Sequence, residues 1–239
     1  MRCTLVFFLL LHCMVNAQLS TRSEQLIGKD STHLSAINGH FLTPSAGKAF
    51  LRMKKAAAKD GIVIKIVSAY RSYAHQKTIW NKKYVRYQEQ GLSDEQIFRE
   101  ITEYSTVPGT SRHHWGTDID IIAVNDNMPD QNILQEKHFQ KGGAFHKMYV
   151  WLKENANDFG FYETYTNDPS RKGFNYEPWH YSYRPQSREF LRVYLKEQLY
   201  AHCIELPLHG LKDVDHILID QYLEQQILDI NPYLKVKDE

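Results

Sequence analysis

Apolar positions along the chain repeat at two different spacings, and the spacing changes several times between the two ends. Runs with an apolar residue at every third or fourth position are typical of amphipathic helices, and β-branched or alternating runs are typical of strands. Helices and strands mix without a regular βαβ repeat, which indicates the α+β class. The pattern predicts helices at residues 43–61, 73–88, 93–104, 144–158, 190–202 and 214–228, and strands at 62–67, at 117–122, from 161 and around 180.

Local signals define several of these boundaries. Thr43-Pro44 is typical of a helix N-cap followed by proline in the first turn, and Ser93 begins a segment that resembles a capping box. By contrast, residues 18–40 are polar without a clear period, and residues 125–143 predict a long loop. Long ordered loops in compact domains are often functional, so this loop is expected to shape one wall of a cleft.

The N-terminus has the pattern of a secretory signal peptide. Arg2 precedes an apolar run at residues 5–11, and the small residues that follow suit cleavage after Ala17. The run is too short for a membrane anchor, and no later segment resembles a membrane span. The predicted division is a signal peptide at 1–17, one domain at 18–190 and a helical C-terminal extension at 191–239, which braces the domain or binds a partner. The expected location is secreted or periplasmic.

Charge and cysteine content exclude some classes of protein. The chain has 29 Lys and Arg against 28 Asp and Glu, and removal of Arg2 with the signal leaves 28 of each. This balance argues against a nucleic-acid-binding protein, which would carry a basic stripe. Cys3 and Cys13 would also be removed, so Cys203 has no partner for an internal disulfide. We expect Cys203 to be a buried, unreactive thiol.

The densest group of candidate functional side chains lies at residues 111–122. Two histidines precede Gly116, and two aspartates follow it. The alternation in the strand places Asp118 and Asp120 on one face, and Gly116 can bend the chain so that His113 approaches them. Imidazole and carboxylate together suit zinc. The alternative is a strand entered through a polar loop, with solvated aspartates.

A second group, at residues 176–181, favours the metal interpretation. Glu177 lies three residues before His180, and Pro178 restricts Glu177 to an extended conformation, which predicts a turn just before a strand. A catalytic zinc needs three protein ligands, an open position and a nearby general base. His113, Asp120 and His180 can supply the ligands, and Glu177 can supply the base.

These motifs resemble those of the VanY-type D-alanyl-D-alanine carboxypeptidases, which are zinc peptidases related to lysostaphin-like enzymes and the hedgehog domain. The matching segments are Ser-x-His-x-x-Gly-x-x-x-Asp at 111–120, Glu-Pro-Trp-His at 177–180, and Ser-Ala-Tyr-Arg-Ser-Tyr at 68–73. The resemblance covers roughly residues 45 to 185. It implies a small antiparallel sheet that carries the zinc site and is flanked by helices.

The resemblance also suggests roles for further residues. Arg71 is the candidate for stabilising the oxyanion, because guanidinium stays charged and offers several donors. Ser111, Tyr70 and Gln76 match family positions and are expected either to contact substrate or to support the residues that do. His114 and Asp118 remain rival ligands, and the carboxylate at 118 departs from the family, where this position is commonly small or apolar.

Three functions remain open. The first is a secreted zinc D,D-carboxypeptidase acting on peptidoglycan stem peptides. The second is a zinc endopeptidase cutting internal peptidoglycan bonds, because arginines that many family members carry are absent near Tyr162 and at Ser182. An exo-acting enzyme must hold a terminal carboxylate, for which arginine is well shaped. The third is a binding protein that keeps zinc for structure. The sequence leaves the oligomeric state open.

Overall fold

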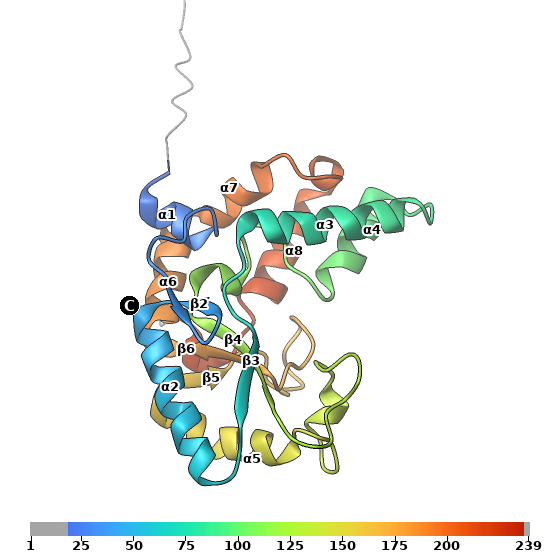
Figure 1. Ribbon diagram of the computed structural model, residues 1–239. Helices are drawn as coiled ribbons and strands as arrows, with labels where there is room; N and C mark the ends of the chain where they lie inside the picture. Colours follow the sequence, from blue (N-terminus) through green and yellow to red (C-terminus); the bar gives the residue numbers. More distant parts are fainter. Residues whose placement is uncertain (1–18, 237–239) are drawn as a thin grey trace, which may run out of the picture.

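A four-stranded antiparallel sheet forms the centre of the molecule (Figure 1). The computed structural model describes residues 19–236, so the predicted signal peptide lies outside the described residues. Helices surround the sheet, and the predicted α+β class is confirmed. In spatial order the strands are β3 (Ile64–Ser68), β4 (Asp118–Ala123), β6 (His180–Tyr183) and β5 (Phe161–Glu163).

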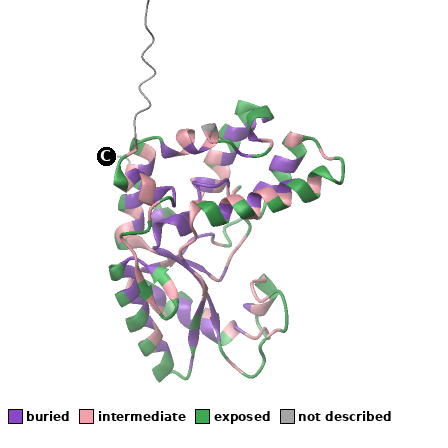
Figure 2. Cartoon of the chain, turned by 45° about the horizontal axis from the view of Figure 1, so that its top comes forward, coloured by how far each residue is buried: buried purple, intermediate pink, exposed green. Residues whose placement is uncertain are grey.

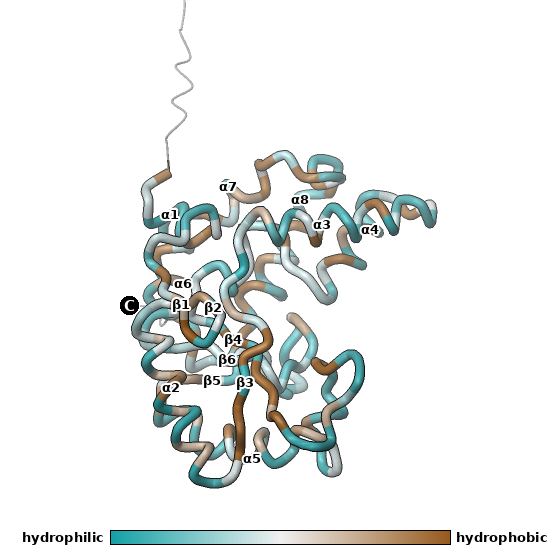
Figure 3. Tube along the Cα trace, in the orientation of Figure 1, coloured by the Kyte–Doolittle hydropathy of each residue, from teal (hydrophilic) through white to brown (hydrophobic). Residues whose placement is uncertain are grey.

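One face of this sheet is apolar and packs against α2 (Pro44–Lys59) and α5 (His146–Asn155). Ile119 and Ile121 of β4 are fully buried there, together with Phe50 from α2 and Met148 from α5. Helix α2 alternates hydrophilic and hydrophobic residues, whereas β3 is largely hydrophobic (Figure 3). The opposite face of β4 carries Asp118 and Asp120, as the alternation predicts.

The N-caps predicted from sequence are present. Thr43 Oγ1 accepts a hydrogen bond from the Ala46 N–H at 3.3 Å, and α2 begins at Pro44. The capping box at α4 (Asp94–Thr102) is complete, with Ser93 and Gln96 bonded reciprocally. The predicted boundaries of α3 (Tyr73–Gln88) are also confirmed.

A second apolar core lies beyond the sheet, where α3 and α4 meet α8 (His216–Tyr222). Its large buried members include Trp80, Phe98 and Tyr222, one from each of these helices. The Tyr222 hydroxyl oxygen accepts a hydrogen bond from the Val107 N–H at 3.0 Å and lies 2.7 Å from Thr110 Oγ1. The C-terminal part of the chain therefore packs against the segment that leads into residues 111–122.

The N-terminal segment has more structure than its sequence predicts. Residues 18–40 contain the short helix α1 (Thr21–Leu26) and the strand β1 (Ser35–Ile37), which pairs with β2 (His40–Leu42). Leu26 and Ile27 are fully buried in a third core with Trp115 and Phe190. Elements of three to six residues are too short to produce a recognisable hydrophobic period, which explains why the pattern missed them.

The C-terminal region differs from its predicted helices. Helix α6 (Arg184–Lys196) crosses position 190, so the predicted domain boundary falls inside a helix. Gln198 adopts a left-handed conformation (φ 50°) and separates α6 from α7 (Leu199–Glu205). Asn231 then bonds to the backbone of Glu163 and Thr164 beside the sheet. These contacts favour the bracing interpretation of the C-terminal extension.

Cys203 is fully buried in α7, and burial raises the pKa of its thiol to about 12. A thiol in this environment carries little thiolate at neutral pH, as expected for an unreactive core residue. Within residues 19–236, no helix combines the length and the apolar character needed to cross a bilayer.

Candidate metal centre and active site

Three elements bring His113, Asp120 and His180 together. Asp120 lies in β4, and His180 begins β6 directly opposite it in the antiparallel register. His113 belongs to the 3₁₀ turn Arg112–Trp115, which ends at Gly116 with φ 66°. A Cβ atom at position 116 would lie 2.4 Å from a methyl group of Leu34, so both the backbone angle and the close packing require glycine.

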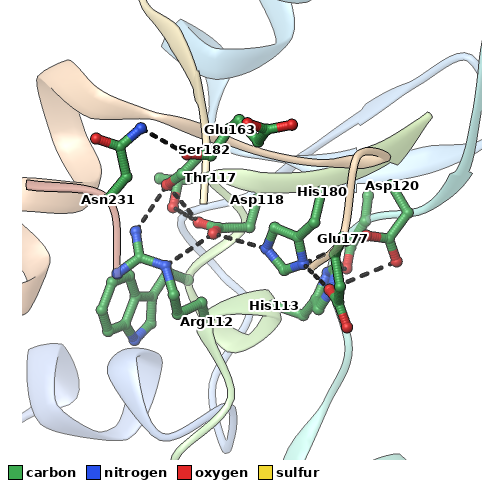
Figure 4. A network of polar contacts seen from close by, with 12 residues as sticks. Arg112, His113, Thr117, Asp118, Asp120, Glu163, Glu177, His180, Ser182 and Asn231 are labelled. Atoms are coloured by element: carbon green, nitrogen blue, oxygen red, sulfur yellow. Dashed lines mark hydrogen bonds and ion pairs between the residues drawn. The ribbon is translucent and has the colours of Figure 1, made fainter. Parts of the chain in front are cut away.

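The potential ligand atoms of these residues all lie within 4.8 Å of one another. His113 Nε2 is 3.5 Å from Asp120 Oδ2, and His180 Nδ1 is 3.4 Å from Asp120 Oδ1 (Figure 4). The Nδ1–H of His113 donates to the Ala69 carbonyl at 2.8 Å, which leaves its Nε2 available as a ligand. The arrangement thus offers one atom from each of three residues.

This group fits a metal ion. Two imidazole nitrogens and one carboxylate are a donor set found in catalytic zinc sites, with a fourth position left for water or substrate. Asp120 Oδ1 is buried and has no hydrogen-bond partner, as expected for an oxygen that faces a cation. In the described part of the chain, this is the group of three that can hold an ion, and no fourth protein ligand joins it.

Glu177 lies beside the three ligands in the turn that sequence predicts. The backbone N–H of His180 donates to the backbone carbonyl of Glu177, which closes a tight turn immediately before β6. Glu177 Oε2 is 3.2 Å from His180 Nδ1, and the side chain keeps 26% exposure. The carboxylate therefore reaches both the ligand cluster and solvent, which a general base for water requires.

The electrostatics of the cluster follow from its burial. Burial, reinforced by the positive charge of Arg71, holds the pKa of His113 well below its ordinary value, so this ligand is neutral. Burial and the nearby charge of Glu177 raise the pKa of Asp120 to about 6. Burial disfavours the charged form of His180, but hydrogen bonds to Asp118 and Glu177 outweigh it and raise its pKa to about 10. A divalent cation bound here would replace the positive charge of the protonated His180 ring beside these carboxylates.

Arg71 lies close enough to Asp120 and Glu177 for their charges to act on it. Burial lowers the pKa of its guanidinium, and these two carboxylates oppose the shift. Arg71 Nη1 donates to Gln76 Oε1 at 3.0 Å. The Gln76 amide in turn donates to the Thr106 carbonyl at 2.8 Å, so this fully buried side chain holds Arg71 in place.

A cavity of about 280 Å³ opens over the cluster. Arg71 and Ser111 line it with Glu177 and the three ligands, and Leu134 from the predicted loop 125–143 forms part of its wall. Tyr70 and Gln76 are not in the lining, and the Tyr70 hydroxyl donates to the Gly28 carbonyl at 3.2 Å. Of the three residues expected to contact substrate or to support the residues that do, Ser111 lines the cavity, and Gln76 supports Arg71 from outside it.

His114 takes a different role from its neighbour. Its Nδ1 lies 2.6 Å from the Arg71 carbonyl, and its Nε2 accepts from the Gly109 N–H at 3.0 Å. Burial lowers the pKa of His114 to about 4, so the ring is neutral and both nitrogens are occupied by backbone groups. His114 therefore fixes the loop that presents Arg71 and is no longer a rival ligand.

Asp118 is buried, although the alternative interpretation of the strand predicted a solvated side chain. All six residues of β4 are buried, and the strands at the centre of the molecule are mostly buried (Figure 2). Arg112 Nε donates to Asp118 Oδ1 at 2.9 Å and covers the polar face. Sequence reasoning gave Arg112 no role, because its pairing with Asp118 depends on the fold of the turn that separates them.

Comparison with known proteins identifies relatives. A family model described as VanY, D-alanyl-D-alanine carboxypeptidase, matches residues 39–186. A D-alanyl-D-alanine carboxypeptidase of Enterococcus faecalis is 33% identical over 129 residues, which cover 54% of this chain and 42% of that protein. One from Enterococcus faecium is 25% identical over 182 residues, which cover 71% of this chain and 50% of that protein. The chain thus spans half or less of the length of these two relatives.

Solved structures resemble the chain as well. The LdcB LD-carboxypeptidase aligns with a TM-score of 0.50 and 22% identity, covering 82% of this chain and 78% of that one, which shows a shared fold. A vancomycin-resistance D,D-pentapeptidase VanY in complex with Zn(II) aligns with a TM-score of 0.48 and 27% identity, covering 68% of this chain and 83% of that one. With the family model matching well over half of its length, this chain belongs to the VanY D-alanyl-D-alanine carboxypeptidase family.

Proposed function

We propose that the protein is a zinc-dependent D,D-carboxypeptidase that removes the terminal D-alanine from peptidoglycan stem peptides. The observation that carries this proposal is the cluster of His113, Asp120 and His180, with Glu177 Oε2 at 3.2 Å from His180 Nδ1. Its donor set suits zinc, and the family to which the chain belongs supplies the substrate class.

Each residue of the site has a separate role in the hydrolysis of the peptide bond. Zinc, when bound, supplies the Lewis acid that activates water and polarises the scissile carbonyl. Glu177 takes the proton of the attacking water and gives it to the leaving amine as the C–N bond breaks. The Arg71 guanidinium stabilises the negative charge that develops on the carbonyl oxygen, and Gln76 keeps it in position. Ser111 lies at the cavity wall, where it can orient the peptide.

Arg71→Ala is expected to lower kcat by about 10²- to 10³-fold with a smaller change in KM, because the charge that Arg71 stabilises exists only in the transition state. Steady-state kinetics on a stem pentapeptide measures both parameters, and metal analysis checks that zinc is retained. Arg71→Lys keeps the charge and should recover part of the rate. An unchanged kcat in Arg71→Ala would remove Arg71 from the mechanism.

The proposed substrate can be tested by release of D-alanine from a purified stem pentapeptide. The matched control is the corresponding tetrapeptide, which lacks the terminal D-Ala-D-Ala bond. We expect D-alanine only from the pentapeptide. Release from the tetrapeptide alone would move the specificity to a different terminal bond while leaving the zinc site intact.

An endopeptidase acting on peptidoglycan cross-links is a second candidate. In the described cavity lining, the arginines are Arg71 and Arg112, and each guanidinium already donates to protein groups. Arg71 is assigned to the oxyanion, and Arg112 is buried in an ion pair with Asp118, so neither guanidinium is reserved for a terminal carboxylate, whereas an internal bond makes no such demand. Cross-linked muropeptides separate the two functions, because internal cleavage yields fragments without free D-alanine.

We also propose that the protein is exported, since its peptidoglycan substrate lies outside the cytoplasmic membrane and residues 1–17 have the signal-peptide pattern. The exported protein is expected to begin at Gln18. N-terminal sequencing of protein recovered from the periplasm or the culture medium measures this directly. A chain that stays in the cytoplasm and still begins at Met1 would contradict the proposed location.

A further inference from the structure

His180 lies between two separate sets of carboxylates. Its Nδ1 faces Asp120 at 3.4 Å and Glu177 at 3.2 Å, on the side of the ligand cluster. Its Nε2 lies 3.1 Å from Asp118 Oδ1, on the opposite side of the ring (Figure 4). Both ring nitrogens therefore have a defined partner, and only one of them can serve the metal.

Burial and hydrogen bonds fix the orientation of the Asp118 carboxylate relative to His180. It is fully buried, and its Oδ1 accepts from Arg112 Nε at 2.9 Å as well as from His180. Its Oδ2 accepts from the hydroxyl groups of Thr117 at 2.7 Å and Ser182 at 2.9 Å. Each carboxylate oxygen thus has two donors, and all of them favour an ionised side chain that can only accept hydrogen bonds.

The positive charge of Arg112 offsets the cost of burying the Asp118 carboxylate. Its Nη2 donates to Ser182 Oγ at 2.7 Å, and the guanidinium lies 4.6 Å from the centre of the Trp115 ring. The cross-strand register places Ser182 directly opposite Asp118. A buried charge needs both an ion-pair partner and further hydrogen bonds, and Asp118 has both.

We propose that Asp118 is a positioning residue that keeps the proton of His180 on Nε2 and turns Nδ1 towards the metal. A carboxylate that accepts from the outer nitrogen of a ligand histidine fixes its tautomer and orientation and makes the inner nitrogen a stronger donor. This inference rests on the proposed zinc site. It also gives a role to the position at which the chain departs from the family pattern.

Two substitutions at position 118 distinguish a role in positioning His180 from a role in balancing the charge of Arg112. Asp118→Ala removes the acceptor, and we expect zinc affinity to fall about 10- to 100-fold. Asp118→Asn keeps an oxygen that can accept from His180 Nε2, so it should recover most of that loss. Competition with a chromophoric zinc chelator measures the dissociation constants. If Asp118 only balances Arg112, both variants lose stability, but zinc affinity of the folded protein stays at the wild-type value, which would overturn the proposal.

Glu163→Ala is the matched control. Glu163 is also a buried carboxylate of this sheet, lies in the neighbouring strand β5 and forms an ion pair with Lys153 at 3.0 Å. Within residues 19–236 its carboxylate forms no ion pair or hydrogen bond with the three ligands, so its loss should leave zinc affinity unchanged. If Asp118→Ala fails to fold, the comparison is made in an Arg112→Met background, which removes the charge that Asp118→Ala would leave unpaired.

The wild-type protein offers a measurement that needs no folded variant at position 118. In the zinc-loaded protein with labelled histidine, nitrogen–proton correlation spectra should show His180 protonated at Nε2 and without a proton at Nδ1. A proton on Nδ1 would overturn the inference. His113→Ala separates the zinc site from the positioning role: if that variant loses zinc while Asp118→Ala binds zinc normally, the zinc site stands and only the positioning role of Asp118 fails.

Discussion

Replacing Glu177 by glutamine is expected to reduce kcat by about 10²- to 10⁴-fold while zinc stays bound. The substitution keeps the shape of the side chain but removes the group that accepts the proton of the attacking water. Glu177 is not one of the three clustered ligands, so metal affinity should change little. D-alanine release from a stem pentapeptide measures the rate, and elemental analysis of the purified protein measures zinc.

The matched control for this prediction is Glu154→Gln, which makes the same chemical change at the other side of the sheet, on the surface of α5. It should leave both kcat and zinc content at the wild-type level. If Glu177→Gln hydrolyses the peptide at the wild-type rate, Glu177 is not the general base. If the variant loses its zinc, the Glu177 carboxylate acts as a metal ligand and not only as a general base.

Removing the metal, or one of its ligands, is expected to reduce hydrolysis to the uncatalysed background. Dialysis of the wild-type protein against a chelator should abolish D-alanine release, and added zinc should restore it. His113→Ala should lose activity permanently, because two ligands hold zinc far less tightly than three. Zinc should also raise the melting temperature of the wild-type protein but not of this variant, since a ligand that binds only the folded state stabilises it.

His146→Ala is the control for the loss of a histidine. His146 is partly buried and its Nδ1 lies 3.0 Å from the Phe139 carbonyl, which resembles the way His113 bonds to Ala69. It belongs to α5, beyond the apolar face of the sheet, and should retain both zinc and activity. Full activity of the metal-free wild-type protein would contradict a role for zinc in the reaction.

The parts of the fold that were predictable depend on local signals. Thr43-Pro44 and the capping box at Ser93 mark helix starts through bonds between neighbouring residues, so the sequence alone identifies them. The strand alternation likewise places Asp118 and Asp120 on one face, because side chains alternate along any strand. Residue chemistry and spacing then suggested the ligands, and the structure brings His113, Asp120 and His180 within ligand distance.

The features that escaped prediction depend on contacts between distant segments. The burial of Asp118 requires Arg112 to fold back over the strand and Ser182 to lie opposite it, and neither follows from local spacing. Tyr70 and Ser111 are equivalent as motif residues, yet only Ser111 lines the cavity, because the Tyr70 hydroxyl bonds to Gly28 in the N-terminal segment. Tertiary contacts therefore decide which motif residues reach the site.

Mass spectrometry of purified muropeptides, after incubation with the zinc-loaded protein and in parallel with Glu177→Gln, tests the proposed carboxypeptidase function. We expect pentapeptide stems to lose one terminal alanine with the wild-type protein and to stay intact with the variant. Loss of alanine with both proteins would point to a contaminating activity or a different catalytic base. Muropeptides that remain uncleaved by fully zinc-loaded wild-type protein would contradict the proposed function.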